Sequence, residues 1–119
     1  MAVIPFERQA LNIEGDVYKS TPLAAGDSTG VLTLNGGNNE VTVHIYGTVG
    51  GSTVTVQGTL VGVQYNVLDD AYGVAMSYTA LTNVVKPVGP AVNGIKVVVT
   101  GGAGVAVTVD VYIVRKVRP

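Results

Sequence analysis

The stretch that decides the fold is IKVVVTGGAGVAVTVDVYI, residues 95–113. Valine or isoleucine recurs at alternate positions on both sides of the glycine-rich segment 101–104. This alternation is typical of a β-strand with one buried face, because successive side chains point to opposite sides of a sheet. Two such runs joined by a glycine-rich turn predict a β-hairpin. The second run ends in the basic tail 115–119.

The same pattern occurs upstream in VTVHIYGTVGGSTVTVQG, residues 41–58. Apolar residues alternate with polar ones on both sides of the pair Gly50–Gly51, and we predict a second hairpin there. About two dozen valines in the whole chain strengthen this prediction, since β-branched residues favour the half-buried surface of a sheet.

Three shorter strands and one proline-containing loop complete the pattern. The loop is KPVGP, residues 86–90, because proline lacks the N–H group that a central strand must donate. The strands are expected at residues 31–34, 64–68 and 74–81. Short strands with glycine-rich turns predict an all-β fold, an antiparallel β-sandwich of the jelly-roll or immunoglobulin-like type.

Residues 1–30 differ from the rest of the chain. They contain Pro5 and Pro22, several charges and apolar residues without a regular period. We predict an extended N-terminal arm over residues 1–30 with one short strand, followed by a β-sandwich domain at 31–119. The arm either packs on its own sandwich or lies on a neighbouring subunit.

Eight residues of the arm and of the C-terminal end are predicted to contact a partner. Large apolar and aromatic side chains carry most of the binding energy of an interface. The basic residues at the C-terminus either form salt bridges in an assembly or serve solubility alone. The predicted interface residues are Ile4, Phe6, Leu11, Ile13, Tyr18, Arg115, Lys116 and Arg118.

The composition excludes several kinds of site. The 119 residues include no cysteine, so neither a disulfide framework nor a thiolate metal site is possible. The net charge of −1 provides no general field for nucleic acid or an acidic membrane, and no signal peptide or membrane span is expected. Charged residues make up only 13% of the chain. This indicates either a surface that is partly covered in the working state or a neutral, threonine-rich one.

We expect no catalytic, metal or cofactor site. The single histidine, His44, lies in a predicted strand, whereas a metal site needs several converging ligands. The pair Asp69–Asp70 is interpreted as a turn in which a carboxylate caps backbone amides, because no EF-hand spacing follows it. The GGAG segment at 101–104 is followed by a strand and not by a helix N-terminus that would bind phosphate. The chain is therefore not expected to be an enzyme.

Four motifs follow one another from residue 41 onward. They are VTVHIYG at 41–47, GGSTVTVQG at 50–58, Tyr65-x-x-Leu68 and VVVTGGAG at 97–104. This order resembles that of small β-sandwich proteins in the particles of tailed bacteriophages, which are capsid decoration (cement) proteins or head-fibre bases. Relatives often have Asp where this chain has Val61 and Trp where it has Tyr65, so the resemblance implies that Tyr65 is an aromatic core residue.

The resemblance implies a decoration protein that binds the outer surface of the phage head and stabilises the capsid lattice. Its partners would be the major capsid protein and further copies of itself, as a homotrimer, with no nucleic acid and no membrane. It would be made in the host cytoplasm and located on the outer surface of the virion.

Two other functions stay open. The same sandwich can belong to a tail, a connector or a head-fibre base, and a β-sandwich can also be a carbohydrate- or receptor-binding module. Such a module usually presents aromatic side chains, and Tyr65, Tyr72 and Tyr78 are the candidates for lining its site.

Overall fold

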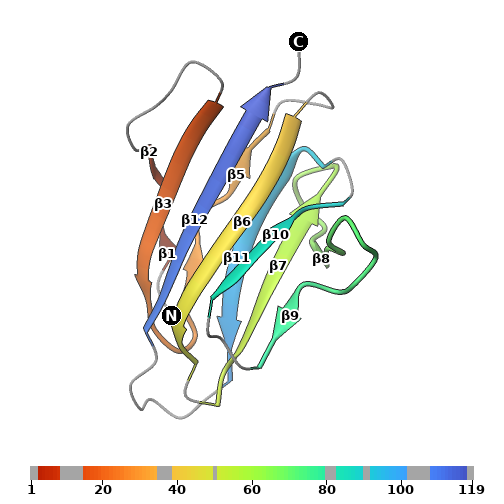
Figure 1. Cartoon of the computed structure of the whole chain (residues 1–119). Coiled ribbons are helices and arrows are strands. Elements are labelled where there is room, and N and C mark those ends of the chain that lie inside the picture. The colour runs from red at the N-terminus through yellow and green to blue at the C-terminus, as the bar shows by residue number, and fades with distance from the viewer. Residues whose placement is uncertain are drawn as a thin grey trace.

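The computed structural model describes residues 3–8, 15–34, 39–49, 51–79, 83–89, 92–101 and 108–117. All regular secondary structure in these ranges is β-strand, arranged in two sheets (Figure 1). The seven-stranded sheet has the order β1 (Val3–Ile4), β4 (Ser28–Thr29), β11 (Gly94–Thr100), β7 (Thr53–Thr59) and β8 (Asn66–Val67), with β5 (Leu32–Thr33) also paired to β11 and β9 (Ser77–Tyr78) to β7. The five-stranded sheet has the order β10 (Val84–Pro87), β6 (Asn39–Thr48), β12 (Thr108–Val117), β3 (Gly15–Leu23) and β2 (Glu7–Arg8).

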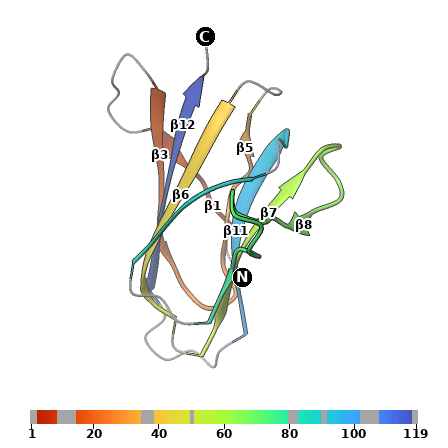
Figure 2. The ribbon, with the colours of Figure 1, turned by 45° about the vertical axis from the view of Figure 1, so that its right-hand side comes forward.

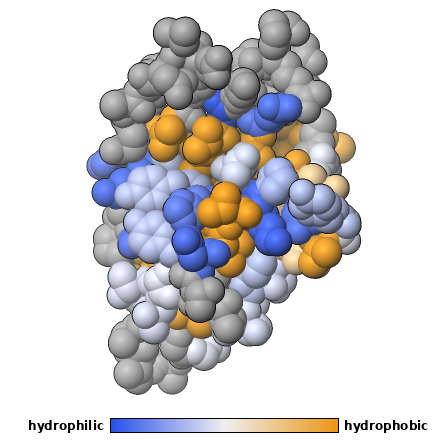
Figure 3. All heavy atoms as spheres, in the orientation of Figure 1, coloured by the Kyte–Doolittle hydropathy of each residue, from blue (hydrophilic) through white to orange (hydrophobic). Residues whose placement is uncertain are grey.

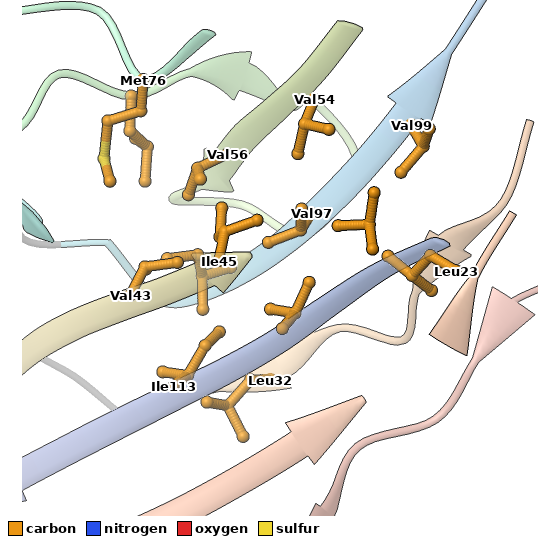
Figure 4. Close-up of a cluster of buried hydrophobic side chains, with 14 of the residues drawn as sticks. Leu23, Leu32, Val43, Ile45, Val54, Val56, Met76, Val97, Val99 and Ile113 are labelled. Carbon is orange, nitrogen blue, oxygen red and sulfur yellow. The ribbon is translucent and has the colours of Figure 1, made fainter. Parts of the chain in front are cut away.

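The two sheets pack face to face, which Figure 2 shows from the side, and this confirms the predicted all-β sandwich. The described strand pairs are antiparallel, apart from the parallel pair of β1 and β4. Alternate side chains of the four long central strands meet between the sheets, and several are drawn in Figure 4. Those without any exposed surface are Val43, Ile45, Val54, Val56, Ile95, Val97, Val99, Val109, Val111 and Ile113. Their burial is the main stabilising term of the fold.

Neither of the two predicted hairpins forms. β6 pairs with β10 and β12, whereas β7 pairs with β11, β8 and β9, so the chain crosses from one sheet to the other between β6 and β7. It crosses again between β11 and β12. The two crossings lie side by side, because Ser52 Oγ donates a 2.9 Å hydrogen bond to the carbonyl oxygen of Gly101. A glycine-rich turn between two strands of alternating polarity can connect strands of different sheets as well as the two strands of a hairpin. The hairpin predictions were wrong for that reason.

Residues 15–23 and 28–29 belong to the sheets, whereas the prediction for residues 1–30 was an extended arm with one short strand. β3 runs for nine residues between β12 and β2, and β4 pairs with β11. Leu23 of β3 is fully buried in the core. The register of β3 on β12 shifts between Val109 and Val111, where Thr21 and Pro22 of β3 lie opposite the single residue Asp110. Such a bulge accommodates a residue without an N–H donor, so proline did not exclude a strand here.

The KPVGP segment was also predicted incorrectly as a loop alone. Lys86 and Pro87 end β10, which is an edge strand of the five-stranded sheet, and Pro87 pairs with Thr42. An edge strand tolerates proline because one of its sides needs no donor. The strand predicted at 74–81 is shorter in the structure: within the described residues it is reduced to Ser77–Tyr78. Residues 80 and 81 lie outside the described ranges.

Candidate functional site

Three of the predicted interface residues pack on the protein's own core. Ile4, Phe6 and Tyr18 are partly buried against the hydrophobic cluster between the sheets. The carbonyl oxygen of Ile4 accepts hydrogen bonds from Ser20 Oγ at 2.7 Å and from the N–H of Gly30 at 2.9 Å. These contacts fix β1 along one side of the sandwich.

Of the other five predicted interface residues, the structure describes only Arg115 and Lys116. The guanidinium carbon of Arg115 lies 5.7 Å from the centre of the Tyr18 ring, within the range of a cation–π contact. Lys116 is placed in β12 by its backbone. Leu11, Ile13 and Arg118 fall outside the described residues, and a contact of these residues with a neighbour stays a prediction.

The Asp69–Asp70 pair forms the predicted turn. Asp70 Oδ1 accepts hydrogen bonds from the N–H groups of Tyr72 at 2.8 Å and Val74 at 3.1 Å.

Within the described ranges, no three histidine or carboxylate side chains converge on a possible metal site. The described part of the chain also contains no apolar helix of membrane-spanning length.

The three tyrosines named as candidates for a carbohydrate site lie in different environments. Tyr65 is partly exposed, and the amino group of Lys96 lies 4.1 Å from the centre of its ring, so it is not the core residue that the resemblance implied. Tyr72 lies in the turn after Asp70 and is 80% exposed. Tyr78 packs partly against the core, and burial together with the nearby Asp70 carboxylate raises its pKa.

A different group of rings meets on the outer face of the five-stranded sheet. His44 and Tyr46 come from β6 and Tyr112 from β12, and all three are partly exposed. The ring centres of Tyr46 and Tyr112 are 6.0 Å apart, and the ring planes differ by only 10°. The centre of the His44 ring lies 5.2 Å from that of Tyr46 and 6.3 Å from that of Tyr112. We call these three residues the aromatic platform.

Strand register brings the aromatic platform together. Tyr112 lies directly opposite His44 in the pairing of β12 with β6, and Tyr46 lies opposite Asp110. The neighbouring positions Ile45 and Val111 are buried between the sheets. Because side chains alternate along a strand, the rings must point away from the core.

Polar groups surround the aromatic platform. His44 Nε2 is hydrogen-bonded to Asn83 Oδ1 at 2.5 Å, and Lys19 of β3 lies opposite Tyr112 with its amino group 5.8 Å from the ring centre. Glu7 of β2 follows opposite Lys19. Figure 3 looks onto this face and shows hydrophilic and pale, ring-shaped side chains over the middle strands, interrupted by hydrophobic ones.

The two phenol groups of the platform are linked. A side-chain hydrogen bond with Tyr112 raises the pKa of Tyr46, and burial raises it further. The bond stabilises the protonated phenol, so Tyr46 is uncharged at neutral pH. The stacked rings of Tyr46 and Tyr112 lie beside two charged residues, Lys19 opposite Tyr112 and Asp110 opposite Tyr46.

A second unusual surface lies at the edge of the seven-stranded sheet. The connection between β7 and β8 carries Leu60, Val61 and Val63, which are 65%, 71% and 82% exposed. We call these three residues the apolar tip. The connection projects from the edge of the sheet in Figure 2. Val31, itself exposed, lies near Thr59, since both would contact a Cβ atom added at Gly94.

The apolar tip is held in place by hydrogen bonds. Thr59 Oγ1 accepts from the N–H groups of Val61 at 3.2 Å and Gly62 at 2.8 Å. Asn93 Nδ2 donates to the carbonyl oxygen of Leu60 at 2.7 Å. Gly62 has a φ of 88°, which glycine adopts without strain. The exposed valines therefore stand on a defined turn.

The sequence alone could have predicted part of the aromatic platform and the position of the apolar tip. His44 and Tyr46 are two residues apart in a predicted strand and therefore share a face, but Tyr112 could join them only once β12 was known to pair with β6. The tip sequence LVGV, residues 60–63, breaks the polar–apolar alternation just after a strand. Such a break beside a glycine is a signal for exposed apolar residues in a turn.

The comparisons with known proteins concern the fold. No family model matches the chain, and no curated protein sequence matches it. The SPBc2 prophage-derived protein YomS has a similar structure, with a TM-score of 0.58 and 14% identity over 89% of this chain and 99% of that one. A protein described under disulfide-linked pili of Bacillus endospore appendages gives a TM-score of 0.44 with 12% identity, over 93% of this chain and 96% of that one. At this identity the likeness to YomS shows a shared fold.

Proposed function

We propose that this chain is a structural protein of a tailed-bacteriophage particle, which decorates the outer surface of the head and works by binding rather than by catalysis. The observation that carries the proposal is the apolar tip, a defined turn that exposes three neighbouring aliphatic side chains, each by more than 60%. The fold shared with a prophage-derived protein supports the phage context. The motif order from residue 41 onward supports it independently.

The apolar tip has the chemistry of a protein-docking element. Burying one exposed aliphatic side chain contributes about 1.5–3 kcal/mol, and a valine lies near the lower end of that range. Three such side chains compensate only part of the cost of association. A homotrimer would present three tips to the major capsid protein at once, and such multivalent binding raises affinity without new contacts.

The remaining predicted interface residues have a place in the same proposal. In this proposal Leu11, Ile13, Lys116 and Arg118 would contact a neighbouring copy or the capsid. With a net charge of −1, the chain has no general attraction for nucleic acid, and the proposal includes none. In this proposal the protein is made in the host cytoplasm and has its working place on the virion surface.

The test is binding of the purified chain to heads of the phage that encodes it, produced without the chain. The variants are wild type, the double variant Val61→Ser/Val63→Ser, and the control Val85→Ser, which alters a 53% exposed valine on the other sheet. Co-sedimentation measures affinity and stoichiometry, and a heating series with a DNA-binding dye measures head disruption. We expect saturable binding and a raised disruption temperature for wild type and control.

The double variant should bind about a hundredfold more weakly, because each valine lost from the interface costs roughly tenfold. Equal binding by the double variant would exclude the tip as the docking surface. If wild type ignores heads but is found on tails by immunogold labelling, head placement is wrong and the tail or connector alternative holds.

A further inference from the structure

We propose that the aromatic platform on the outer face of the five-stranded sheet is a binding site for a saccharide. The site consists of His44, Tyr46 and Tyr112, with Lys19 and Asp110 beside them. It lies on a different sheet from the apolar tip and does not depend on the docking of the chain to a capsid.

The ring geometry suits the apolar face of a sugar. A pyranose ring has C–H groups on one face, and these pack on the π-face of an aromatic side chain in the way that other apolar groups do. The near-parallel rings of Tyr46 and Tyr112, with centres 6.0 Å apart, offer two adjoining surfaces of this kind. The tilted His44 ring, 5.2 Å from Tyr46, borders them on β6.

The polar neighbours suit the hydroxyl groups of a sugar. Each hydroxyl both donates and accepts a hydrogen bond, so a matching site needs donors and acceptors around its apolar centre. Lys19 supplies a donor on one side of Tyr112, and Asp110 supplies an acceptor beside Tyr46. The phenol groups of the two tyrosines and the Asn83 amide next to His44 add groups that can do both.

The aromatic platform is also pre-organised. Its residues lie on the two long strands β6 and β12, which pair over ten positions in the middle of the sheet. The His44–Asn83 hydrogen bond and the stacking of the Tyr46 and Tyr112 rings restrict the side chains further. A site whose groups are already fixed loses little conformational entropy when a ligand binds.

A saccharide fits this face better than a protein partner does. The centre of a protein interface is depleted of charged residues, whereas this row runs Glu7, Lys19, Tyr112, His44, Val85 across the five strands. Charged side chains therefore stand directly next to the rings. The aromatic ring faces would contact the C–H face of a sugar unit, and the polar side chains beside them would bind its hydroxyl groups.

The experiment uses the full chain on a microarray of bacterial surface polysaccharides and defined oligosaccharides. The test variant is Tyr112→Thr, since threonine is a good strand former and keeps the fold. The matched control is Tyr72→Thr, which changes a tyrosine that is 80% exposed and is not part of the platform. Far-UV circular dichroism and thermal melting check that all three proteins are folded.

We expect wild type and Tyr72→Thr to bind the same saccharides, and Tyr112→Thr to bind them at least about tenfold more weakly. His44 is the only histidine in the chain, so its ring protons give single NMR signals. These signals should shift on titration with the best saccharide from the array, and in Tyr112→Thr the same shift should need a higher saccharide concentration. The tip variant Val61→Ser/Val63→Ser should keep saccharide binding, which separates this site from the docking proposal.

Two results would overturn the inference. One is that wild type binds no saccharide on the array. The other is that Tyr112→Thr binds as tightly as wild type. If Tyr112→Thr instead loses binding to phage heads while wild type binds no saccharide, the face is a protein contact and the saccharide proposal is wrong.

Discussion

The aromatic platform and the apolar tip expose apolar surface in two different ways. The platform residues His44, Tyr46 and Tyr112 lie in mid-strand, partly exposed and surrounded by charged and amide groups. The tip residues stand at the end of a strand, more than 60% exposed on a short turn. Rings beside hydrogen-bonding groups fit a small hydroxylated ligand, whereas projecting aliphatic groups fit a complementary protein pocket. This difference is the reason for proposing two separate binding sites on one sandwich.

The largest effect is expected from Gly47→Ala, which disturbs the strand that carries the platform. Gly47 has a φ of 128°, and an added Cβ would lie 2.0 Å from the carbonyl oxygen of Thr108. Because that neighbour is backbone in the paired strand β12, the clash cannot be relieved by a side chain. We expect a loss of about 3 kcal/mol or more in the free energy of unfolding, measured by urea denaturation.

A matched control for this prediction is Gly51→Ala, another glycine with positive φ. No atom lies within 4 Å of a Cβ added at Gly51, so only the cost of its φ of 86° applies. The loss should be about 1 kcal/mol. Equal losses for the two variants would show that the clash with β12 does not form in solution.

A medium effect is expected from Thr59→Val, which acts on the tip and leaves the platform unchanged. Valine keeps the shape of the buried Thr59 side chain but removes the oxygen that accepts from Val61 and Gly62. We expect a loss of about 1 kcal/mol in stability. Amide hydrogen exchange at Val61 and Gly62 should become faster, while exchange in β6 and β12 stays as in wild type.

This variant also sharpens the functional comparison. Binding to phage heads should weaken, because a mobile turn must be ordered on docking. Saccharide binding should be unchanged. Thr55→Val, a polar-to-apolar change in the same strand β7, is the control. Weakened saccharide binding in Thr59→Val would mean that the two sites are not independent.

The smallest effect is expected from alkaline pH, and it concerns the platform alone. The pKa of Tyr46 in the folded chain is raised above the ordinary value of 10.0, chiefly by the hydrogen bond with Tyr112. A raised pKa means that folding favours the protonated phenol, so this contribution is complete below about pH 10 and is lost as the pH rises through the folded-state value. The melting temperature of the variant Tyr46→Phe should therefore fall less than that of wild type when the pH is raised from about 9 to about 11.

Tyr72→Phe is the matched control for the pH series, since Tyr72 lies outside the platform. Its melting temperature should fall with pH as that of wild type does. The pKa of Tyr78 is also raised, by burial and by Asp70, so part of the alkaline loss should persist in both variants. A Tyr46→Phe profile identical to wild type would contradict the hydrogen bond between the two phenols.

Much of the fold was determined by the sequence alone. Alternating valines and isoleucines at 41–45, 54–56 and 95–99 were predicted to be strands with one buried face, and those side chains fill the core. The turn at Asp70 was also predicted correctly, because its carboxylate caps amides only two and four residues away. Such features depend on neighbours in the sequence, so local chemistry is sufficient to determine them.

Strand partners and both candidate surfaces were decided by the tertiary structure. Whether a glycine-rich turn returns the chain to the same sheet or sends it to the other depends on which sheet leaves an edge to be paired. β3 is a strand because β12 supplies its partners, although its own sequence lacks a clear period. Tyr112 meets His44 and Tyr46 only through the register of β12 on β6. Hydrogen bonds between distant strands set these contacts, and no short stretch of sequence contains both partners.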